Sequence, residues 1–401
     1  MRYAFADCLL DTDRHELTRA GNPVEVEPQV FDLLVLLAAN AGQLVTKDAL
    51  VEAVWQGRIV SESAISARIA AARKVVGDDG KAQAVIRTVA RKGVQMVAEV
   101  AVEVPDAPAA LTIAKPRIAE MPPKPAARFA RAEDGTMLAY RVIGKGPPVV
   151  LLEHFPTTME RYWLHPWSGD FCASLCQNHT VVIFDQRGCG LSAKTLDDDD
   201  AALMPKDVHS VAVAAGFERY GLIGRSGGAA FSALCASQNP DSVEALVLQG
   251  GYAVGRALRD GATAVADSIE AMQREGWDTP GSPFIEGYIR VYFPDAGPAD
   301  VHATGEGLRQ SCPIENALWG RRTHNHVDIR DQLASIKAPT LVAQSAGDAV
   351  HPLEQAQILA AGIPGAELIT FDSRNHYVLS HEPAWPDQLD AILGHLARHM
   401  S

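Results

Sequence analysis

The sequence predicts a multidomain protein in which a small α+β domain precedes a larger α/β domain with a mostly parallel sheet. Three observations support this prediction. The first hundred residues contain three amphipathic helical segments and a basic hairpin, the next stretch is rich in proline, and the remainder alternates continuous apolar runs with helical segments. Because buried parallel strands consist of unbroken apolar runs, the last pattern indicates a sheet covered by helices on both faces.

Length and composition exclude several classes of protein. The chain has 401 residues, of which 47% are hydrophobic and 21% charged, as in an ordinary soluble protein. No stretch approaches the roughly 20 apolar residues of a membrane span, and the first residues lack the apolar core of a signal peptide. The six cysteines lack zinc-type spacing. We therefore expect a cytoplasmic protein with reduced thiols, no bound metal, no cofactor and no membrane contact.

The charge is distributed unevenly along the chain. The net charge is −13, yet residues 58–92 carry eight Lys or Arg against three Asp or Glu. A protein with an acidic body and one basic segment is expected to contact polyanions only at that segment.

The first domain is predicted from its helices and its closing hairpin. The expected elements are strands at 3–10 and 14–26, helices at 29–37, 47–55 and from 61 or 63 to about 77, and strands at 85–89 and 94–97. Thr46 is a good N-cap for the second helix, and either Ser61 or Ser63 can begin the third. The third helix has a predicted buried stripe of Ile65, Ile69, Ala72 and Val76.

Three helices followed by a basic hairpin predict a winged helix-turn-helix. In such a domain the third helix enters the major groove and the hairpin reaches the phosphates beside it. Small residues on the outer face of this helix favour recognition through phosphates and DNA shape. The residues expected to contact double-stranded DNA are Ser63, Ser66, Arg68, Arg73, Lys74, Arg87, Arg91 and Lys92. A winged helix used only for protein contacts is the alternative.

Residues 3–100 resemble the OmpR/PhoB-type DNA-binding domain. The segments that carry the resemblance are Phe31-Asp32-Leu33-Leu34, residues 40–46, Val54-Trp55, residues 63–76 with Arg73-Lys74, and Ile86-Arg87-Thr88-Val89. The family's Gly-Tyr-Arg-Phe in the wing is Gly93-Val94-Gln95-Met96 here. The resemblance implies DNA binding as a homodimer. Because no receiver domain precedes the module in this sequence, it also implies a one-component regulator.

Residues 101–127 are expected to link the two domains. The stretch contains six prolines, which are incompatible with a helix or an inner strand. It therefore predicts a semi-rigid spacer between a domain at 1–100 and a domain at 128–401.

The second domain begins with a predicted hairpin and continues as buried strands separated by helices. The hairpin strands are 129–132 and 138–143, and the apolar runs are 148–152, 180–185, 221–223, 243–248, 339–343 and 366–371. Between about 251 and 325 lies a helical insertion with clustered aromatic residues, namely Tyr252, Trp277, Phe284, Tyr288, Tyr292, Phe293 and Trp319.

The stretch 220–231 contains the pattern Gly-x-Ser-x-Gly between a strand and a helix. A serine in such a turn adopts a strained backbone, and the glycines on both sides remove steric clashes. We therefore predict that Ser226 is a nucleophile; the alternative is a plain strand-to-helix turn.

From residue 128 to the C-terminus the chain resembles the α/β-hydrolase family. The resemblance rests on the turn at Ser226, on residues 185–192, on 338–348 and on 375–383. It implies the catalytic residues Ser226, Asp348 and His376, with the insertion 251–325 as a cap over the pocket. Asp372 is a rival acid that lies too close in sequence to the histidine, and His351 and His381 are expected to be structural or exposed.

The three residue types fit nucleophilic catalysis. A histidine near neutral pKa can accept the serine proton, and an aspartate can hold the imidazole in the required tautomer. The backbone N–H groups of Phe155 and Gly227 are the expected oxyanion-hole donors. Where the family often has His-Gly-Phe-Pro, this chain has Glu153-His154-Phe155-Pro156. Glu153, His154 and Arg225 are the expected substrate-binding residues, although Arg225 can equally form a salt bridge under the cap.

Three functions fit these features. The first is a transcriptional regulator whose hydrolase-fold domain binds a small molecule, with or without hydrolysing it. The second is an active serine hydrolase of esters, lactones or amides with an accessory DNA-binding module. The third is a catalytically inert scaffold for protein contacts.

Overall fold

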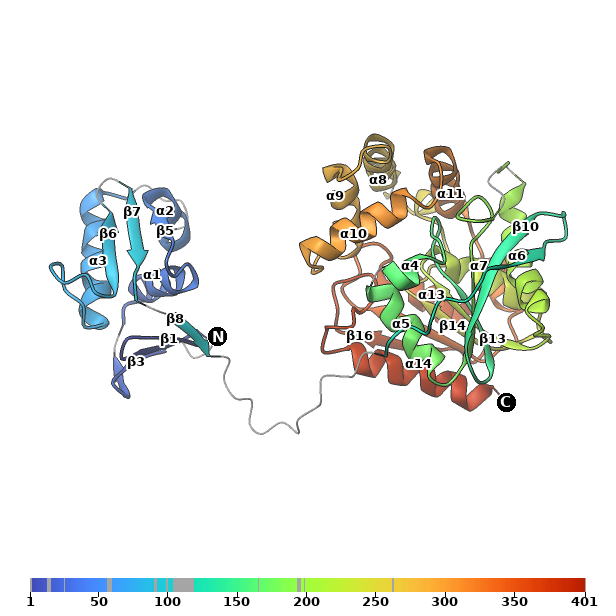
Figure 1. Cartoon of the computed structure of the whole chain (residues 1–401), viewed down its shortest axis with the longest axis horizontal. Helices are drawn as coiled ribbons and strands as arrows, with labels where there is room; N and C mark the ends of the chain where they lie inside the picture. The colour runs from blue at the N-terminus through green and yellow to red at the C-terminus, as the bar shows by residue number, and fades with distance from the viewer. Residues whose placement is uncertain are drawn as a thin grey trace. The chain divides into compact units, whose positions relative to one another are not determined.

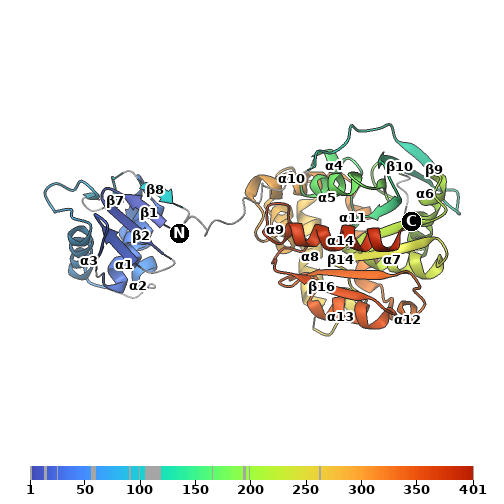
Figure 2. The same cartoon turned by 90° about the horizontal axis from the view of Figure 1, so that it is seen from below.

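The computed structural model divides into two compact units, Met1–Ile113 and Ala114–Ser401, and both are drawn in Figure 1 and, after a rotation of 90°, in Figure 2. The structure describes residues 2–12, 16–24, 26–55, 60–89, 92–98, 100–103, 119–164, 166–192, 196–197, 199–261 and 263–400. Within these ranges no helix is long and apolar enough to cross a membrane, and no cluster of His, Cys, Asp and Glu is arranged to hold a metal ion.

The first unit begins with an antiparallel sheet of strand order β4-β3-β2-β1-β8. Its strands are β1 (Arg2–Phe5), β2 (Cys8–Asp11), β3 (Glu16–Arg19), β4 (Asn22–Val24) and β8 (Val100–Glu103). The two predicted strands at 3–10 and 14–26 therefore each divide into two. The division occurs because the backbone turns with positive φ at Ala6 (49°) and at Ala20 and Gly21 (48° and 78°).

Three helices share one hydrophobic core with this sheet, and the first of them packs against the other two. They are α1 (Pro28–Ala39), α2 (Lys47–Trp55) and α3 (Glu62–Val75). Ser61 is the N-cap of α3, because its Oγ accepts a hydrogen bond from the amide of Ala64 over 3.3 Å. The predicted apolar stripe of α3 is buried as expected, from Ile65 to Val76.

A small antiparallel sheet of order β5-β7-β6 completes the unit. It consists of β5 (Leu44–Thr46), β6 (Ile86–Val89) and β7 (Gly93–Met96), and β6 and β7 form the predicted hairpin with Val89 opposite Gly93. A Cβ on Gly93 would lie 2.0 Å from the carbonyl oxygen of Val45. Only glycine therefore lets β7 approach β5 this closely.

The proline-rich stretch is structured at both ends. Its first residues belong to β8, an edge strand that pairs with β1. Near its other end, the carbonyl of Pro122 accepts a hydrogen bond from Trp163 Nε1 over 2.9 Å, and Lys124 forms an ion pair with Glu160. The interval 104–118, which includes three of the six prolines, lies outside the described residues.

The second unit is built on an eight-stranded sheet of order β16-β15-β14-β13-β11-β12-β10-β9. Its strands are β9 (Arg128–Arg131), β10 (Met137–Gly144), β11 (Pro148–Leu152), β12 (Thr180–Phe184), β13 (Tyr220–Arg225), β14 (Val243–Gln249), β15 (Thr340–Ser345) and β16 (Glu367–Phe371). The strands β11 to β16 pair in parallel, while β10 is antiparallel to both neighbours. The predicted, mostly parallel sheet is therefore confirmed.

Helices cover both faces of this sheet. On one face, α5 (Pro166–Cys176) and α14 (Trp385–His399) pack a core that includes Phe171 and Trp385. On the other face lie α6 (Asp200–Ala214), α7 (Gly227–Gln238) and α13 (Leu353–Gly362). Short helices are found at α4 (Arg161–Leu164), η1 (Arg256–Leu258) and α12 (Arg330–Leu333).

Besides η1, the described residues of the predicted helical insertion form four α-helices. They are α8 (Thr263–Gly276), α9 (Pro283–Tyr292), α10 (Pro298–Arg309) and α11 (Ile314–His326). Figure 1 shows them grouped at one end of the sheet, in yellow to orange-brown. Trp277 lies in the core of this group with 1% of its surface exposed, whereas Phe284 is 51% exposed.

Candidate functional site

Ser226 lies in the tight turn between β13 and α7. Its φ of 54° and ψ of −125° are unusual for a residue with a side chain and cost roughly 1–3 kcal/mol. A Cβ on Gly224 would lie 2.7 Å from Ala229 Cα, and a Cβ on Gly228 would lie 2.5 Å from the carbonyl oxygen of Leu152. The glycines on both sides of Ser226 are therefore a steric requirement of this turn.

Asp348 fixes the orientation of His376. Asp348 Oδ2 lies 2.7 Å from His376 Nδ1, and both side chains are only 1% exposed. The carboxylate also accepts hydrogen bonds from the amides of Val350 and His351 and from Gln344 Nε2. The hydrogen on Nδ1 therefore points at Asp348, which leaves Nε2 as an acceptor. Nε2 is buried and has no hydrogen-bond partner within the described part of the chain.

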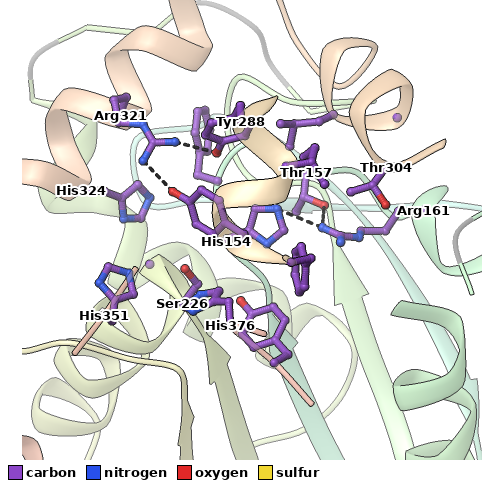
Figure 3. A pocket seen from close by; sticks show the side chains of 18 of the residues that line it. His154, Thr157, Arg161, Ser226, Tyr288, Thr304, Arg321, His324, His351 and His376 are labelled. Atoms are coloured by element: carbon purple, nitrogen blue, oxygen red, sulfur yellow. Dashed lines mark hydrogen bonds between the residues drawn. The ribbon is translucent and has the colours of Figure 1, made fainter. Parts of the chain in front are cut away.

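Ser226 and His376 line the same cavity, together with residues from the insertion (Figure 3). The other lining side chains come from the turn after β11, from α4, η1, α9 with the residue after it, α10 and α11, and from the loops after β14, β15 and β16. They include His154, Phe155, Thr157, Arg161, Tyr252, Arg256, Tyr288, Tyr292, Phe293, Thr304, Arg321, His324, His351 and Tyr377. The insertion therefore forms part of the cavity wall, which is the position that was predicted for it as a cap.

Asp372 and His381, the alternatives considered from the sequence, are exposed and do not line the cavity. His351, which was expected to be structural or exposed, does line it. Its ring packs 5.3 Å from the ring of His376, and its Nδ1 lies 3.2 Å from Arg259 Nη2.

Three of the histidines that line the cavity, His154, His324 and His351, are held neutral. Burial, together with the Arg161 guanidinium, lowers the pKa of His154 to about 4. Burial and the nearby Arg321 lower the pKa of His324 to about 3. Burial, with His376 and Arg259 nearby, also holds the pKa of His351 well below its usual range. At neutral pH the positive charge of the cavity therefore comes from its arginines.

Glu153 and Arg225 form an ion pair that does not line the cavity. Arg225 Nη1 lies 2.8 Å from Glu153 Oε1, and the side chains are 3% and 2% exposed. Arg225 Nε also donates to Gln249 Oε1, and its guanidinium packs 4.0 Å from the ring centre of Tyr377 and 4.5 Å from that of Phe171. Although burial opposes it, Arg225 and Arg161 hold the pKa of Glu153 well below its usual range.

Glu153 and Arg225, which were predicted to contact a substrate, are therefore bonded to each other instead of lining the cavity. Of the three predicted substrate-binding residues, only His154 lines it. Its Nε2 accepts a hydrogen bond from Arg161 Nη1 over 3.2 Å. Phe155 and Gly227, the predicted oxyanion-hole residues, also line the cavity.

Sequence reasoning missed Arg161, Arg256, Arg321 and His324, all of which line the cavity. Arg256, Arg321 and His324 lie within the predicted cap, where the aromatic residues were the stronger signal. Arg161 lies beyond the turn that follows β11. None of these four residues belongs to a sequence motif, so only their spatial convergence identifies them.

The predicted DNA-contacting residues divide into two groups. Ser63, Ser66, Lys74, Arg87 and Lys92 are exposed on α3, on β6 and at the hairpin turn. Arg91 lies outside the described residues. These five side chains are therefore accessible to solvent, as the predicted contact with DNA requires.

Arg68 and Arg73 are instead bonded within the domain. The guanidinium of Arg68 donates to Glu27 and to Gln29, at the start of α1. Arg73 donates from Nε to the carbonyl of Ile86 over 3.0 Å and from Nη2 to Thr88 Oγ1 over 2.7 Å. Both arginines therefore connect α3 to neighbouring elements, a role that the sequence prediction did not include.

Comparisons with known proteins agree with these two folds. The family model described as "alpha/beta hydrolase fold" matches residues 147–383, and the model described as "Transcriptional regulatory protein, C terminal" matches residues 21–96. Among curated proteins, the RutD protein of Klebsiella pneumoniae (strain 342), which carries the name putative carbamate hydrolase, is 26% identical over 235 residues. This alignment covers 58% of the chain and 85% of RutD.

Solved structures show the same fold in the second unit. An esterase from Exiguobacterium antarcticum is 22% identical with a TM-score of 0.56, and the match covers 68% of this chain and 98% of the esterase. A hydrolase from Pseudomonas aeruginosa is 25% identical with a TM-score of 0.55, covering 68% of this chain and 99% of that one. The chain therefore belongs to the α/β-hydrolase fold family, and it carries at residues 21–96 the winged-helix DNA-binding domain of OmpR/PhoB-type transcriptional regulators.

Proposed function

We propose that this protein is a one-component transcriptional regulator whose hydrolase-fold domain binds and cleaves a small molecule. One observation carries the proposal: Ser226 and a histidine fixed by Asp348 line one cavity, in a chain that also has a DNA-binding domain. In this proposal the protein acts in the cytoplasm, and as a homodimer it reads two half-sites on DNA.

The proposed reaction is acyl transfer to Ser226. Ser226 Oγ attacks the carbonyl carbon of an ester, lactone or amide while His376 Nε2 accepts the hydroxyl proton. His376 then returns this proton to the leaving oxygen or nitrogen, and an acyl-serine remains. Water attacks the acyl-serine, His376 accepts the proton of the water, and the acid leaves as the proton returns to Ser226. Asp348 stabilises the imidazolium in both steps.

The backbone amides of Phe155 and Gly227 are the proposed donors to the oxyanion. Gly227 is the first residue of α7, where the backbone N–H groups have no partner within the helix. The ion pair of Glu153 with Arg225 favours this assignment, since a neutralised carboxylate does not repel the developing oxyanion.

The proposed DNA contacts are made by Ser63, Ser66, Lys74, Arg87 and Lys92. They are exposed, and α3 presents small side chains beside them, including Ala67 and Ala70. Small side chains allow a helix to approach the floor of the major groove, while the cationic residues meet phosphates.

An active hydrolase with an accessory DNA-binding module is the second candidate. The constellation of Ser226, Asp348 and His376 favours it, because binding alone does not require a fixed histidine. The two candidates differ in one measurable respect. A regulator changes its affinity for DNA when the cavity is filled, whereas an enzyme that is only located on DNA does not.

Fluorophosphonate labelling combined with a DNA gel shift tests the proposal. We expect a fluorophosphonate to label the full chain at Ser226, slow turnover of 4-nitrophenyl esters, and loss of both in Ser226→Ala. We also expect the labelled protein to bind its own promoter duplex with an affinity different from that of the unlabelled protein. Ester turnover that survives in Ser226→Ala excludes the hydrolytic mechanism, and unchanged DNA affinity favours the second candidate.

A further inference from the structure

The cavity above Ser226 contains an excess of positive charge. Three arginines line it, Arg161, Arg256 and Arg321, whereas no aspartate or glutamate does so among the described residues. None of these three guanidiniums makes an ion pair with a carboxylate in the described parts of the chain. The hydrogen bonds that they donate there go to neutral groups.

Each of these arginines is held in place by neutral acceptors. Arg321 donates to Tyr288, Tyr292 and Gln273 over 2.6, 2.9 and 2.9 Å. Arg161 donates to the hydroxyls of Ser168 and Thr157, each over 2.8 Å, and Arg256 donates to the carbonyl of Val350. A guanidinium has five N–H donors, so each retains donors that are not engaged in these bonds.

Arginines elsewhere in the same domain are treated differently. Buried Arg187 is surrounded by Asp134, Asp200 and Asp207, and buried Arg225 is paired with Glu153. Where this fold uses a buried arginine for structure, it therefore supplies carboxylates. The cavity arginines, of which Arg256 is buried and Arg161 and Arg321 are half-buried, lack such partners among the residues that the structure describes, although withdrawing an unpaired charge from water is costly.

Two of the cavity arginines, Arg256 and Arg321, also act on a shared group, the ring of His351. Burial and Arg256 lower the pKa of Arg259 to about 10, as expected for neighbouring cations. Burial and His376 lower the pKa of His351 most, and Arg259, Arg256 and Arg321 lower it further, so that His351 is held neutral. Figure 3 shows Arg321 and Arg161 at opposite sides of the cavity, with His154 between them and Ser226 below in the view.

We propose that the unpaired positive charge of Arg161, Arg256 and Arg321 selects a ligand with a carboxylate, and that the substrate is an ester or amide carrying this second, negatively charged group. The substrate assignment rests on the proposed hydrolytic function of the same site. Arginine suits this role because its planar donors match the two oxygens of a carboxylate. The anion would neutralise charges that the protein itself leaves unpaired.

Two esters that differ only at the far end of the acyl chain test the proposal in the full chain. Mono-4-nitrophenyl adipate ends in a carboxylate, and 4-nitrophenyl hexanoate ends in a methyl group. We expect kcat/KM for the adipate to exceed that for the hexanoate by at least about tenfold, the scale of one charge-assisted hydrogen bond. This ratio should fall about tenfold in Arg321→Gln and also fall in Arg161→Gln, and recover in part in Arg321→Lys, which restores the charge.

Arg322→Gln is the matched control. Arg322 follows Arg321 on α11, is exposed and does not line the cavity, so its removal changes the net charge equally without altering the site. Its adipate-to-hexanoate ratio should equal that of the unmodified protein. A ratio that falls as far in Arg322→Gln as in Arg321→Gln, or a ratio near one in the unmodified protein, overturns the proposal.

A binding measurement separates this proposal from the hydrolytic one. Adipate and its neutral isostere adipamide are titrated into Ser226→Ala by calorimetry. Tighter binding of adipate, weakened in Arg161→Gln, supports the anion site even where neither ester is cleaved, in which case only the hydrolytic function fails. Cleavage of both esters with equal binding of adipate and adipamide overturns the anion site and leaves the hydrolytic function intact.

Discussion

Arg225 and Glu153 form a buried ion pair 2.8 Å apart. Arg225 directly precedes Ser226 in the chain, and Glu153 directly follows β11. Removing one partner of a buried pair leaves the other charged and unpaired. We expect Glu153→Gln to lower the free energy of unfolding of the second unit by about 3–5 kcal/mol. Denaturant titration measures this change.

A double-mutant cycle with Arg225→Met isolates the coupling within this pair. The double variant should be more stable than Glu153→Gln alone, because no unpaired charge remains. Glu270→Gln is the control, since it breaks the exposed pair with Arg274 on α8 and should change stability far less. Additive effects of the two single changes would contradict the predicted coupling.

Asp348 should be the acid that supports His376. Asp348→Asn keeps the shape of the side chain but favours the wrong imidazole tautomer, so kcat/KM for a 4-nitrophenyl ester should fall on the order of 10⁴-fold. Exposed Asp372 is the rival acid, and Asp372→Asn should leave kcat/KM unchanged. Comparable losses in both variants would mean that the acid has been assigned incorrectly.

The stability of the second unit should fall as the pH falls below 6.5, the ordinary pKa of histidine. The unfolded chain protonates His324 near that value, whereas burial and Arg321 lower its pKa to about 3 in the folded protein. The unfolded state therefore binds more protons in this interval, so acid favours unfolding. For His324 alone the loss is at most roughly 1.4 kcal/mol per pH unit.

His324→Asn should weaken the dependence of stability on pH. His326→Asn is the control and should not weaken it, because His326, two residues further along the chain, is exposed. Urea titrations at several pH values on both sides of the ordinary histidine pKa measure the difference. Every tryptophan except Trp55 lies in the second unit, so fluorescence reports mainly on its unfolding. Parallel curves for the native protein and His324→Asn would rule out this contribution.

DNA affinity should depend on Lys74 and Arg87. Both side chains are exposed, on α3 and β6, and each is expected to neutralise a phosphate. Lys74→Ala with Arg87→Ala should reduce the slope of log K against log salt concentration by about 2. Arg219→Ala with Arg398→Ala removes two exposed charges from the second unit and should leave the slope unchanged. Fluorescence anisotropy with a labelled duplex measures both.

Arg73 should affect the stability of the β6–β7 hairpin more than it affects contact with DNA. Arg73→Ala removes two hydrogen bonds to β6, at Ile86 and Thr88, and should destabilise the hairpin by about 1–3 kcal/mol. Faster hydrogen exchange in β6 measures this change. Arg87→Ala is the control, because Arg87 is exposed on the same strand and its loss should leave the exchange rates of β6 unaltered.

The fold of both units follows from local features of the sequence. The helix starting after Ser61 is determined by a side-chain cap and an apolar stripe, and the parallel strands by unbroken apolar runs. Ser226 was also identifiable, since Gly224 and Gly228 are required by contacts within a few residues and by the strand beside them. The order of Ser226, Asp348 and His376 supplied the remaining members of the candidate site.

The roles of the arginines were decided only by the tertiary structure. Arg225 stands next to Ser226, yet it pairs with Glu153 away from the cavity, while Arg321 lies far along the chain and lines it. The role of a guanidinium depends on the group that it contacts. Which group this is depends on how elements that are distant in the sequence pack together. A sequence pattern records the backbone requirements of a turn or a helix, but it does not record which distant side chains share a cavity.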